Sequence, residues 1–228
     1  MPVTAAPARA TQNDGTYPRP QLVRPAWTDL CGAWDFAVDA DDAGLAERWY
    51  EPGSAAFDRT ITVPFPPEAQ ASGVGETGFL GVVWYRRTVA AGDVPALGCG
   101  NGTGTDTGAS CTLLNFGAVD HSCDVWADGR LVGSHTGGQT PFTLDLTDAV
   151  RRADGGDLTL VVRAVDDPLD VAQPRGKQDW QVDPHAIWYD RTTGIWQPVW
   201  LETVPRCTSS ASRGRRTWPP RPCASRSC

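Results

Sequence analysis

Short runs of β-branched and aromatic residues, each closed by Gly, Pro or Asp, fill most of this chain between Trp27 and Val204. Runs of this length and composition are typical of β-strands. Asp128-Gly129 stands between two of them and predicts a tight hairpin. Helical periodicity is confined to Asp41–Tyr50 and Thr147–Arg152, so the sequence predicts an all-β sandwich. The predicted strands are Asp58–Pro64, Val83–Val89, Cys111–Val119, Asp124–Ala127, Arg130–Ser134, Phe142–Leu146, Leu158–Val165 and Gln197–Val204.

Charge and composition exclude several classes of function. The formal net charge of −7 disfavours nucleic acid and anionic membrane surfaces as partners. No apolar run reaches the ~20 residues of a membrane span. The three histidines are scattered and none of the seven cysteines is spaced as CxxC, so we expect no metal and no other cofactor. The N-terminus shows no secretory signal, which favours a cytoplasmic protein with free thiols over a Cys99–Cys111 disulfide.

Three segments depart from the strand pattern. Residues 1–20, rich in Ala, Pro, Thr and Arg, are expected to be a flexible lead-in. Gly98–Gly108 is a low-complexity loop whose glycines miss the spacing of a phosphate-binding motif. Residues 206–228 hold six Arg and five Ser but no acid and no Leu, Ile, Val, Phe or Met, which predicts disorder. This segment is either a basic tail for an acidic partner or a frameshifted end, and the abrupt change of composition favours the frameshift.

Aromatic and polar side chains are crowded together between Pro174 and Glu202. A flat ring beside hydrogen-bonding groups suits a sugar, whose C–H face stacks on the ring while its hydroxyls take directed bonds. The alternative for the aromatic residues is packing between two sheets, and the alternative for the charged ones is loop solvation or mutual pairing. The candidate sugar-binding residues are Gln178, Asp179, Trp180, Trp188, Tyr189, Asp190 and Arg191. Among them, Gln178 is expected to be exposed.

The order of residues in Ile187–Glu202 resembles the end of the N-terminal sugar-binding domain of glycoside hydrolase family 2. That family includes the β-galactosidases, β-glucuronidases and β-mannosidases. The resemblance extends from about Arg19 to Val204, and it implies a jelly-roll β-sandwich of the galactose-binding-like type over residues 21–205. Seven further segments follow the family pattern in order: Leu30–Phe36, Val63–Glu68, Ser72–Gly75, Val83–Arg87, Phe116–Asp120, Val125–Gly133 and His135–Gly138.

The resemblance also implies what this chain lacks. In the intact family the catalytic carboxylates lie on a barrel that follows this domain and an immunoglobulin-like domain, and the acid/base Glu follows an Asn. No Asn-Glu pair occurs here, so we assign no catalytic residue and interpret the chain as truncated before the barrel. Many members complete the substrate pocket with an Asp about six residues before the Gly of a Gly-Ile-aromatic motif. That position is Trp188 here, and the nearest acid is Asp190.

Three functions remain open from the sequence. The first is the sugar-binding part of a β-glycosidase, with carbohydrate as ligand and the immunoglobulin-like and barrel domains of the same chain as partners. The second is a free-standing carbohydrate-binding module. The third is an interaction domain whose aromatic surface packs on other domains, because a galactose-binding sandwich supports all of these roles.

Overall fold

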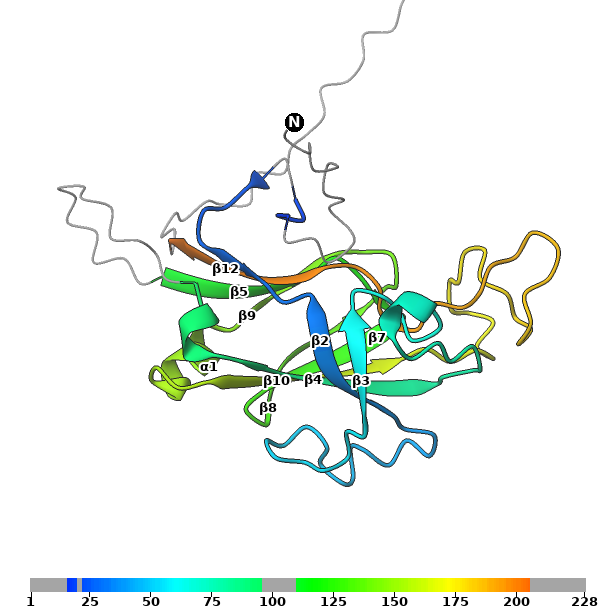
Figure 1. Cartoon of the computed structure of the whole chain (residues 1–228), viewed down its shortest axis with the longest axis horizontal. Coiled ribbons are helices and arrows are strands. Elements are labelled where there is room, and N and C mark those ends of the chain that lie inside the picture. Colours follow the sequence, from blue (N-terminus) through cyan, green and yellow to red (C-terminus); the bar gives the residue numbers. More distant parts are fainter. Residues whose placement is uncertain (1–15, 20–21, 96–109, 206–228) are drawn as a thin grey trace, which may run out of the picture.

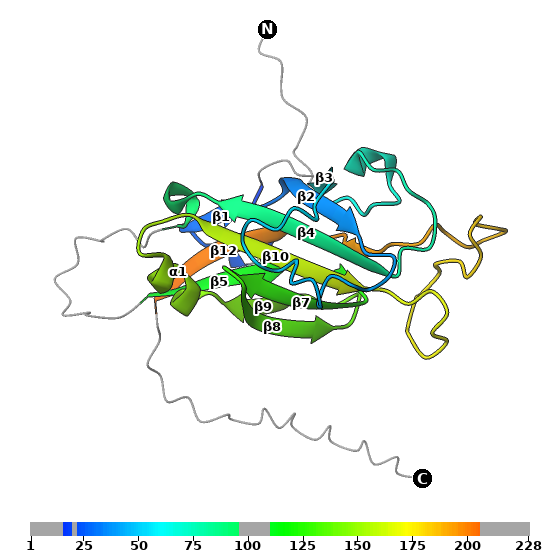
Figure 2. The same ribbon diagram turned by 90° about the horizontal axis from the view of Figure 1, so that it is seen from below.

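Two antiparallel sheets pack face to face in the computed structural model, which describes residues 16–19, 22–95 and 110–205 (Figures 1 and 2). The six-stranded sheet has the order β3 (Arg59–Val63), β2 (Gly32–Val38), β4 (Val82–Val89), β10 (Leu158–Val165), β7 (Ser122–Ala127) and β8 (Arg130–Thr136). The four-stranded sheet has the order β1 (Trp27–Asp29), β12 (Val199–Pro205), β5 (Ser110–Phe116) and β9 (Phe142–Asp145). A separate ribbon pairs β11 (Gly194–Ile195) with β6 (Val119–Asp120). The predicted all-β jelly-roll sandwich is confirmed.

The strand alternation of the six-stranded sheet produces two apolar clusters. Val83 and Tyr85 of β4 point between the sheets, where Tyr85 meets Phe36 of β2 with ring centroids 5.2 Å apart. Trp84 lies between them in sequence and therefore faces the outer side of the sheet. It stacks there on Trp126 of β7 at a centroid distance of 5.5 Å. Both tryptophans are therefore buried in a second apolar cluster, which lies outside the sandwich.

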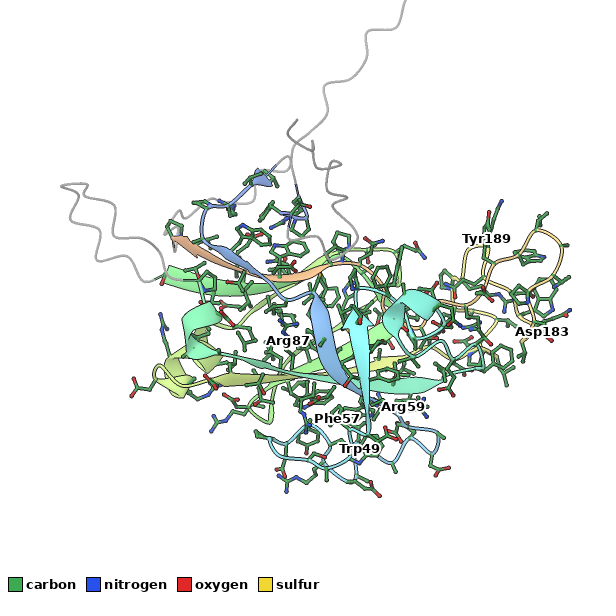
Figure 3. The ribbon with its side chains drawn as sticks, in the orientation of Figure 1. Trp49, Phe57, Arg59, Arg87, Asp183 and Tyr189 are labelled. Atoms are coloured by element: carbon green, nitrogen blue, oxygen red, sulfur yellow. The ribbon has the colours of Figure 1, made fainter. Side chains whose placement is uncertain are left out.

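Residues 39–57 cover this outer cluster, and we call them the strap. Trp49 lies 5.8 Å from Trp84, and Tyr50 stacks on Trp126 at 5.2 Å. Figure 3 shows Trp49 and Phe57 beneath the sheet, on the side away from the four-stranded sheet. Aromatic area that the sheet alone would leave in water is thereby buried.

One buried carboxylate joins the start of the strap to the sheet. Asp39 is 3% exposed, and its oxygens accept hydrogen bonds from the backbone N–H groups of Ala43 (2.8 Å) and Gly44 (2.9 Å). The same carboxylate accepts the indole N–H of Trp84 at 2.9 Å. A Cβ at Gly44 would lie 2.8 Å from the Trp84 ring, so this close approach requires glycine.

The predicted helix over Asp41–Tyr50 is wrong, because this part of the strap consists of turns. Arg48 adopts a left-handed conformation with φ of 59°, which interrupts any helix. Packing of Trp49 and Tyr50 against the sheet overrides a local periodicity that favours a helix. The other predicted helix is confirmed as α1 (Thr147–Ala153), and two short 3-10 turns occur at η2 (Gln70–Ser72) and η3 (Ala91–Asp93).

Most predicted strands are present with small shifts. Leu158–Val165 coincides with β10, and Asp128-Gly129 turns between β7 and β8 with φ of 48° and 74°, as a hairpin turn requires. The single strand predicted over Cys111–Val119 is instead divided at Gly117 into β5 and β6. The strand predicted from Gln197 begins at Val199.

Within the predicted lead-in, two residues contact the last strand. The hydroxyl of Tyr17 donates to Glu202 of β12 at 2.5 Å, and Arg19 pairs with the same carboxylate. Burial alone would raise the pKa of Glu202, but the bonds from Tyr17, Trp200 and Arg19 outweigh it and lower the pKa. The predictions for Cys99, for Gly98–Gly108 and for residues 206–228 concern segments outside the described residues.

Cys31, Cys111 and Cys123 are unpaired thiols, and burial raises the pKa of Cys31 and Cys123 to about 12. None of the helices in the described ranges is long and apolar enough to cross a membrane.

Candidate functional site

A long irregular segment, residues 166–193, projects from one end of the sandwich (right-hand side of Figure 1), and we call it the end loop. It carries a disproportionate share of the exposed apolar side chains. Of the eleven large hydrophobic residues that are exposed in the described part of the chain, six lie in this loop: Leu169, Val171, Trp180, Val182, Ile187 and Tyr189. Exposed apolar residues concentrated in one segment mark an interaction surface.

The tip of the end loop, residues 179–189, is held by hydrogen bonds within the loop. The backbone N–H of Asp179 donates to Tyr189 O, and the N–H of Tyr189 donates to Lys177 O, both at 2.9 Å. The Asp179 carboxylate accepts the N–H groups of Gln181 (3.0 Å) and His185 (2.7 Å) and the His185 ring Nδ1 (2.6 Å). Burial alone would raise the pKa of Asp179, but these bonds outweigh it and lower the pKa. Asp179 is therefore a structural centre of the tip.

Three rings gather around this carboxylate. Trp180 meets His185 edge to face at a centroid distance of 5.2 Å and meets Trp188 at 5.1 Å. The guanidinium of Arg175 lies 5.7 Å from the centre of the Trp180 ring. Tyr189 is 64% exposed at the far side of the tip, and Figure 3 places it well away from both sheets. Packing between the sheets, the alternative interpretation of these aromatics, is thus wrong.

Gln178 anchors the tip to the sandwich from a buried position, so the expectation that it is exposed is wrong. Its amide Nε2 donates to Asp120 Oδ2 at 2.7 Å, and its Oε1 accepts the N–H of Thr192 at 2.9 Å. Burial raises the pKa of Asp120 to about 6, although the bond from Gln178 opposes the rise. A Cβ at Gly138 would lie 1.9 Å from Asp120 Oδ1, so a glycine is required beside this carboxylate.

A second buried anchor closes the base of the end loop, where Arg191 pairs with Asp166, the residue that follows β10. Its Nη2 donates to Asp166 Oδ2 at 2.8 Å, and the two side chains are only 4% and 1% exposed. Thr193 donates its hydroxyl to Asp166 at 3.3 Å and its backbone N–H to Glu68 at 3.2 Å. Burial raises the pKa of Glu68 to about 7. The guanidinium of Arg191 therefore holds the loop in place, and its ion pair is part of the architecture.

Tyr189 and Asp190 line a shallow cavity of about 250 Å³ between the end loop and the turn that follows β3. The other lining residues are Pro66, Glu68, Ala69, Arg191 and Thr192. The structure thus distributes the predicted site residues over three places. Trp180 and Trp188 lie at the tip around Asp179, Tyr189 and Asp190 line the cavity, and Gln178 and Arg191 are buried anchors.

Sequence reasoning missed Glu68, Asp166 and His185. Glu68 closes a Pro-Pro turn and Asp166 directly follows β10, so both lie where strands end and loops begin. His185 lies six positions after its partner Asp179, a spacing that belongs to no regular element. The two other tryptophans of the crowded segment lie elsewhere. Trp196 donates to Gly138 O, and Trp200 is buried beside Glu202.

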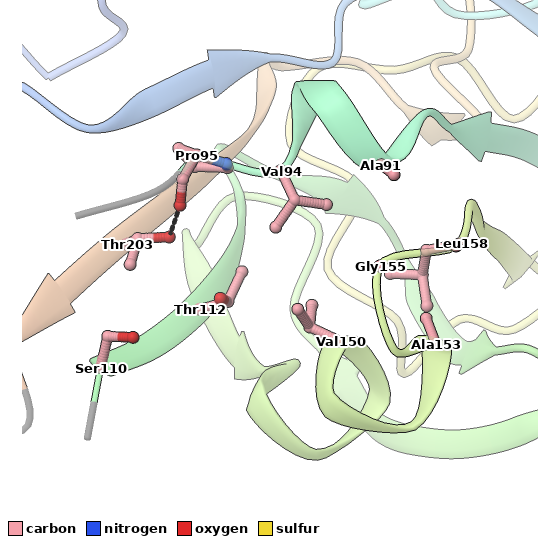
Figure 4. Close-up of a pocket in the computed structure, with 11 residues that line it drawn as sticks. Ala91, Val94, Pro95, Ser110, Thr112, Val150, Ala153, Gly155, Leu158 and Thr203 are labelled. Atoms are coloured by element: carbon pink, nitrogen blue, oxygen red, sulfur yellow. Dashed lines mark hydrogen bonds between the residues drawn. The ribbon is translucent and has the colours of Figure 1, made fainter. Parts of the chain in front are cut away.

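A larger cavity of about 410 Å³ lies at the other end of the sandwich, beside α1 (Figure 4). Val94, Val150 and Leu158 give it an apolar wall, and Thr112 and Thr203 add hydroxyls. The lining, as far as the described residues form it, contains no charged side chain. Sugar sites combine aromatic faces with several directed polar groups, so the end loop is the better candidate. The described ranges hold no group of three or more His, Cys, Asp or Glu residues that could bind a metal.

The fold and the end loop together define a sandwich domain of the sugar-binding class. The model of the family described as glycosyl hydrolases family 2, sugar binding domain, matches residues 27–205. The chain belongs to this family.

Two curated relatives of this chain are beta-glucuronidases. A beta-glucuronidase of Paenibacillus borealis is 29% identical over 153 residues, which cover 65% of this chain and 23% of the relative. A beta-glucuronidase of Canis lupus familiaris is 29% identical over 140 residues, which cover 59% of this chain and 20% of the relative. The chain thus spans less than a quarter of the length of these relatives.

The structure of a β-glucuronidase from Ruminococcus gnavus in complex with uronic deoxynojirimycin matches with a TM-score of 0.57 at 18% identity. That match covers 81% of this chain and 30% of the other. A beta-glucuronidase from an uncultured Clostridium species matches with a TM-score of 0.53 at 24% identity. At such identities the likeness of the structures shows the fold alone.

Proposed function

We propose that the end loop is the carbohydrate-contacting surface of this domain, and that the domain serves a β-glucuronidase-like glycosidase. One observation carries the proposal. Trp180 and Tyr189 are 44% and 64% exposed on a loop whose two ends are joined by the buried Arg191–Asp166 pair. Exposed rings held by a rigid base offer stacking faces with little ordering cost on binding. Two relatives of this chain are beta-glucuronidases, which supports the class of enzyme.

We propose further that hydrolysis belongs to other domains of the intact enzyme. Retaining hydrolysis needs two carboxylates ~5 Å apart that flank the scissile bond. The chain has no Asn-Glu pair, and it spans 23% of the Paenibacillus relative. On this proposal the domain contributes part of a sugar subsite and acts with the immunoglobulin-like and barrel domains.

A second candidate function is a docking surface for such domains. Leu169 and Val171 are 78% and 90% exposed and are aliphatic, so they offer no ring for a sugar to stack on. Aliphatic side chains this open to water favour a protein neighbour. The two functions are compatible, because they use different residues of the end loop.

An NMR titration of the ¹⁵N-labelled protein with galactose, glucuronate and mannose tests the carbohydrate proposal. The indole N–H signals of Trp180 and Trp188 are expected to shift, with an affinity around millimolar, because one or two exposed rings contribute only a few kcal/mol. Trp188→Ala is expected to abolish the shifts while the fold is retained. Leu131→Ala, which truncates a 58% exposed residue of β8, is the matched control and is expected to bind normally.

Shifts confined to the cavity around Val150 and Thr203 would place the sugar site at the other end of the sandwich. Loss of the folded spectrum in Trp188→Ala would show that the ring is needed for the fold, and the docking function would then be preferred.

A further inference from the structure

We infer that His185 is the hydrogen-bond acceptor of a subsite beside Trp180 and Trp188, and that this subsite binds a sugar hydroxyl and has no preference for a carboxylate. The inference rests on the proposed carbohydrate-binding function of the end loop. It adds one named polar group to that loop and a chemical preference that follows from the geometry of that group.

The orientation of the imidazole is fixed by Asp179. His185 Nδ1 lies 2.6 Å from Asp179 Oδ2, and the carboxylate also accepts the backbone N–H of His185 at 2.7 Å. The side chain of Asp179 is 1% exposed, so a buried carboxylate holds the imidazole ring in place. Since a carboxylate only accepts hydrogen bonds, the ring proton is assigned to Nδ1, and Nε2 of the neutral ring keeps its lone pair.

Nε2 is open to a ligand. No residue that the structure describes donates a hydrogen bond to it, whereas Nδ1 is fully engaged with Asp179. The His185 side chain is 41% exposed, so the ring reaches solvent although its partner Asp179 is buried.

The neighbouring rings supply the apolar half of the subsite. Trp180 packs against His185 at 5.2 Å with an interplanar angle of 88°, and Trp188 packs against Trp180 at 5.1 Å with an angle of 71°. Rings set at steep angles form a corner. A pyranose that stacks its C–H face on an indole keeps its equatorial hydroxyls at the edge of the stack, where an acceptor beside the indole can receive one of them.

Charge determines which polar group the subsite accepts. The neutral imidazole and the Asp179 carboxylate together carry one negative charge, and a ligand carboxylate at Nε2 would face both this charge and a lone pair. A hydroxyl instead donates its proton to Nε2. The opposing influence is Arg175, whose guanidinium lies 5.7 Å from the Trp180 ring centre and attracts anions. The test therefore includes Arg175→Gln.

Methyl β-glucopyranoside and methyl β-glucopyranosiduronate are suitable probes, because they differ only at C6. Both are titrated at pH 8 into protein with ¹⁵N-labelled histidine, and the imidazole and indole signals are followed. We expect the free protein to show the Nδ1–H form of His185, and the Nε2 signal to move when either probe binds. The glucuronide is expected to bind no more tightly than the glucoside, in wild type and in Arg175→Gln.

Two variants separate the acceptor from the fold of the tip. His185→Asn keeps an N–H for Asp179 but removes Nε2, and it is expected to weaken the binding of both probes about fivefold, which is roughly 1 kcal/mol for one hydrogen bond. The control His135→Asn alters a histidine of β8 that bonds Thr140 and is expected to leave affinity unchanged.

The outcomes distinguish this inference from the proposed function. Indole signals of Trp180 and Trp188 that move while the His185 Nε2 signal stays fixed would overturn the inference and leave the function standing. Glucuronide binding more than threefold tighter than glucoside binding, or a proton found on Nε2 in the free protein, would overturn it as well. Indole signals unmoved by both probes would overturn the proposed function together with the inference.

Discussion

The strap and the end loop are both irregular segments rich in aromatic residues, yet they treat those residues in opposite ways. The strap presses Trp49 and Tyr50 onto outward-facing tryptophans of the sheet. The end loop leaves Trp180 and Tyr189 44% and 64% exposed. The difference lies in what the sandwich places underneath. Below the strap it offers rings. Below the end loop it offers the buried acids Asp120 and Glu68, which bond the loop and provide no apolar surface for its rings.

The largest expected effect tests the strap. Trp84→Ala removes the ring on which Trp49 and Trp126 pack and leaves Asp39 without its indole donor. We expect a loss of about 3–5 kcal/mol in the free energy of unfolding, as for other large buried aromatics. Denaturation in urea measures it, with Leu131→Ala as the exposed control. A loss below about 1 kcal/mol would show that packing of the strap adds little to stability. The contrast between the strap and the end loop would then be wrong.

An intermediate effect tests the polar base of the end loop through pH. Glu68 has a pKa raised by burial from 4.5 to about 7, so between these values the folded state keeps a proton that the unfolded state releases. The free energy of unfolding therefore falls as pH rises through this window and levels off above it. Glu68→Gln removes this contribution. The free energy of unfolding of the variant minus that of wild type is expected to be roughly 1–3 kcal/mol larger at pH 8 than at pH 4.5.

Urea denaturation of both proteins at several pH values measures this change. Glu76→Gln, on an exposed carboxylate that pairs with Arg59, serves as the matched control and should give curves parallel to wild type. Parallel curves for Glu68→Gln as well would mean that Glu68 is solvated and that the base of the end loop is not buried in solution.

The smallest expected effect is the counterpart of the first. Trp180→Ala removes an indole that is 44% exposed and whose ring contacts are with His185 and Trp188 of the same loop. We expect a change of at most about 1 kcal/mol in the free energy of unfolding, because little buried area is lost. The same urea series measures it. A loss near that of Trp84→Ala would place Trp180 among the core residues and remove the contrast between the two segments.

The sandwich was largely predictable because its strands carry their signals locally. In β10 the inward-facing residues Leu158, Leu160 and Val162 alternate with the residues between them, and the predicted bounds agree with the structure. The same alternation places Trp34 and Phe36 of β2 in the core, a signal that was present in the sequence and was not used. The helix predicted in the strap was wrong for the opposite reason. The conformation of the strap depends on Trp84, a residue distant in sequence.

The candidate site was predictable as a region but not as an arrangement. Crowded aromatics identified the loop, yet Gln178 and Arg191 looked like ligand-binding residues and are buried anchors. Their partners Asp120 and Asp166 lie 58 and 25 positions away along the chain, a separation that periodicity cannot register. His185 escaped notice because its role depends on a turn that only the Asp179 carboxylate creates.

The Asp39 carboxylate has a consequence for how this molecule opens. It joins two backbone amides of the strap and one indole of β4, so a displacement of the carboxylate weakens all three bonds at once. We expect solvent to reach Ala43, Gly44 and the Trp84 indole largely through a shared opening event. We therefore expect the first turn of the strap to open and close together with the strand beneath it.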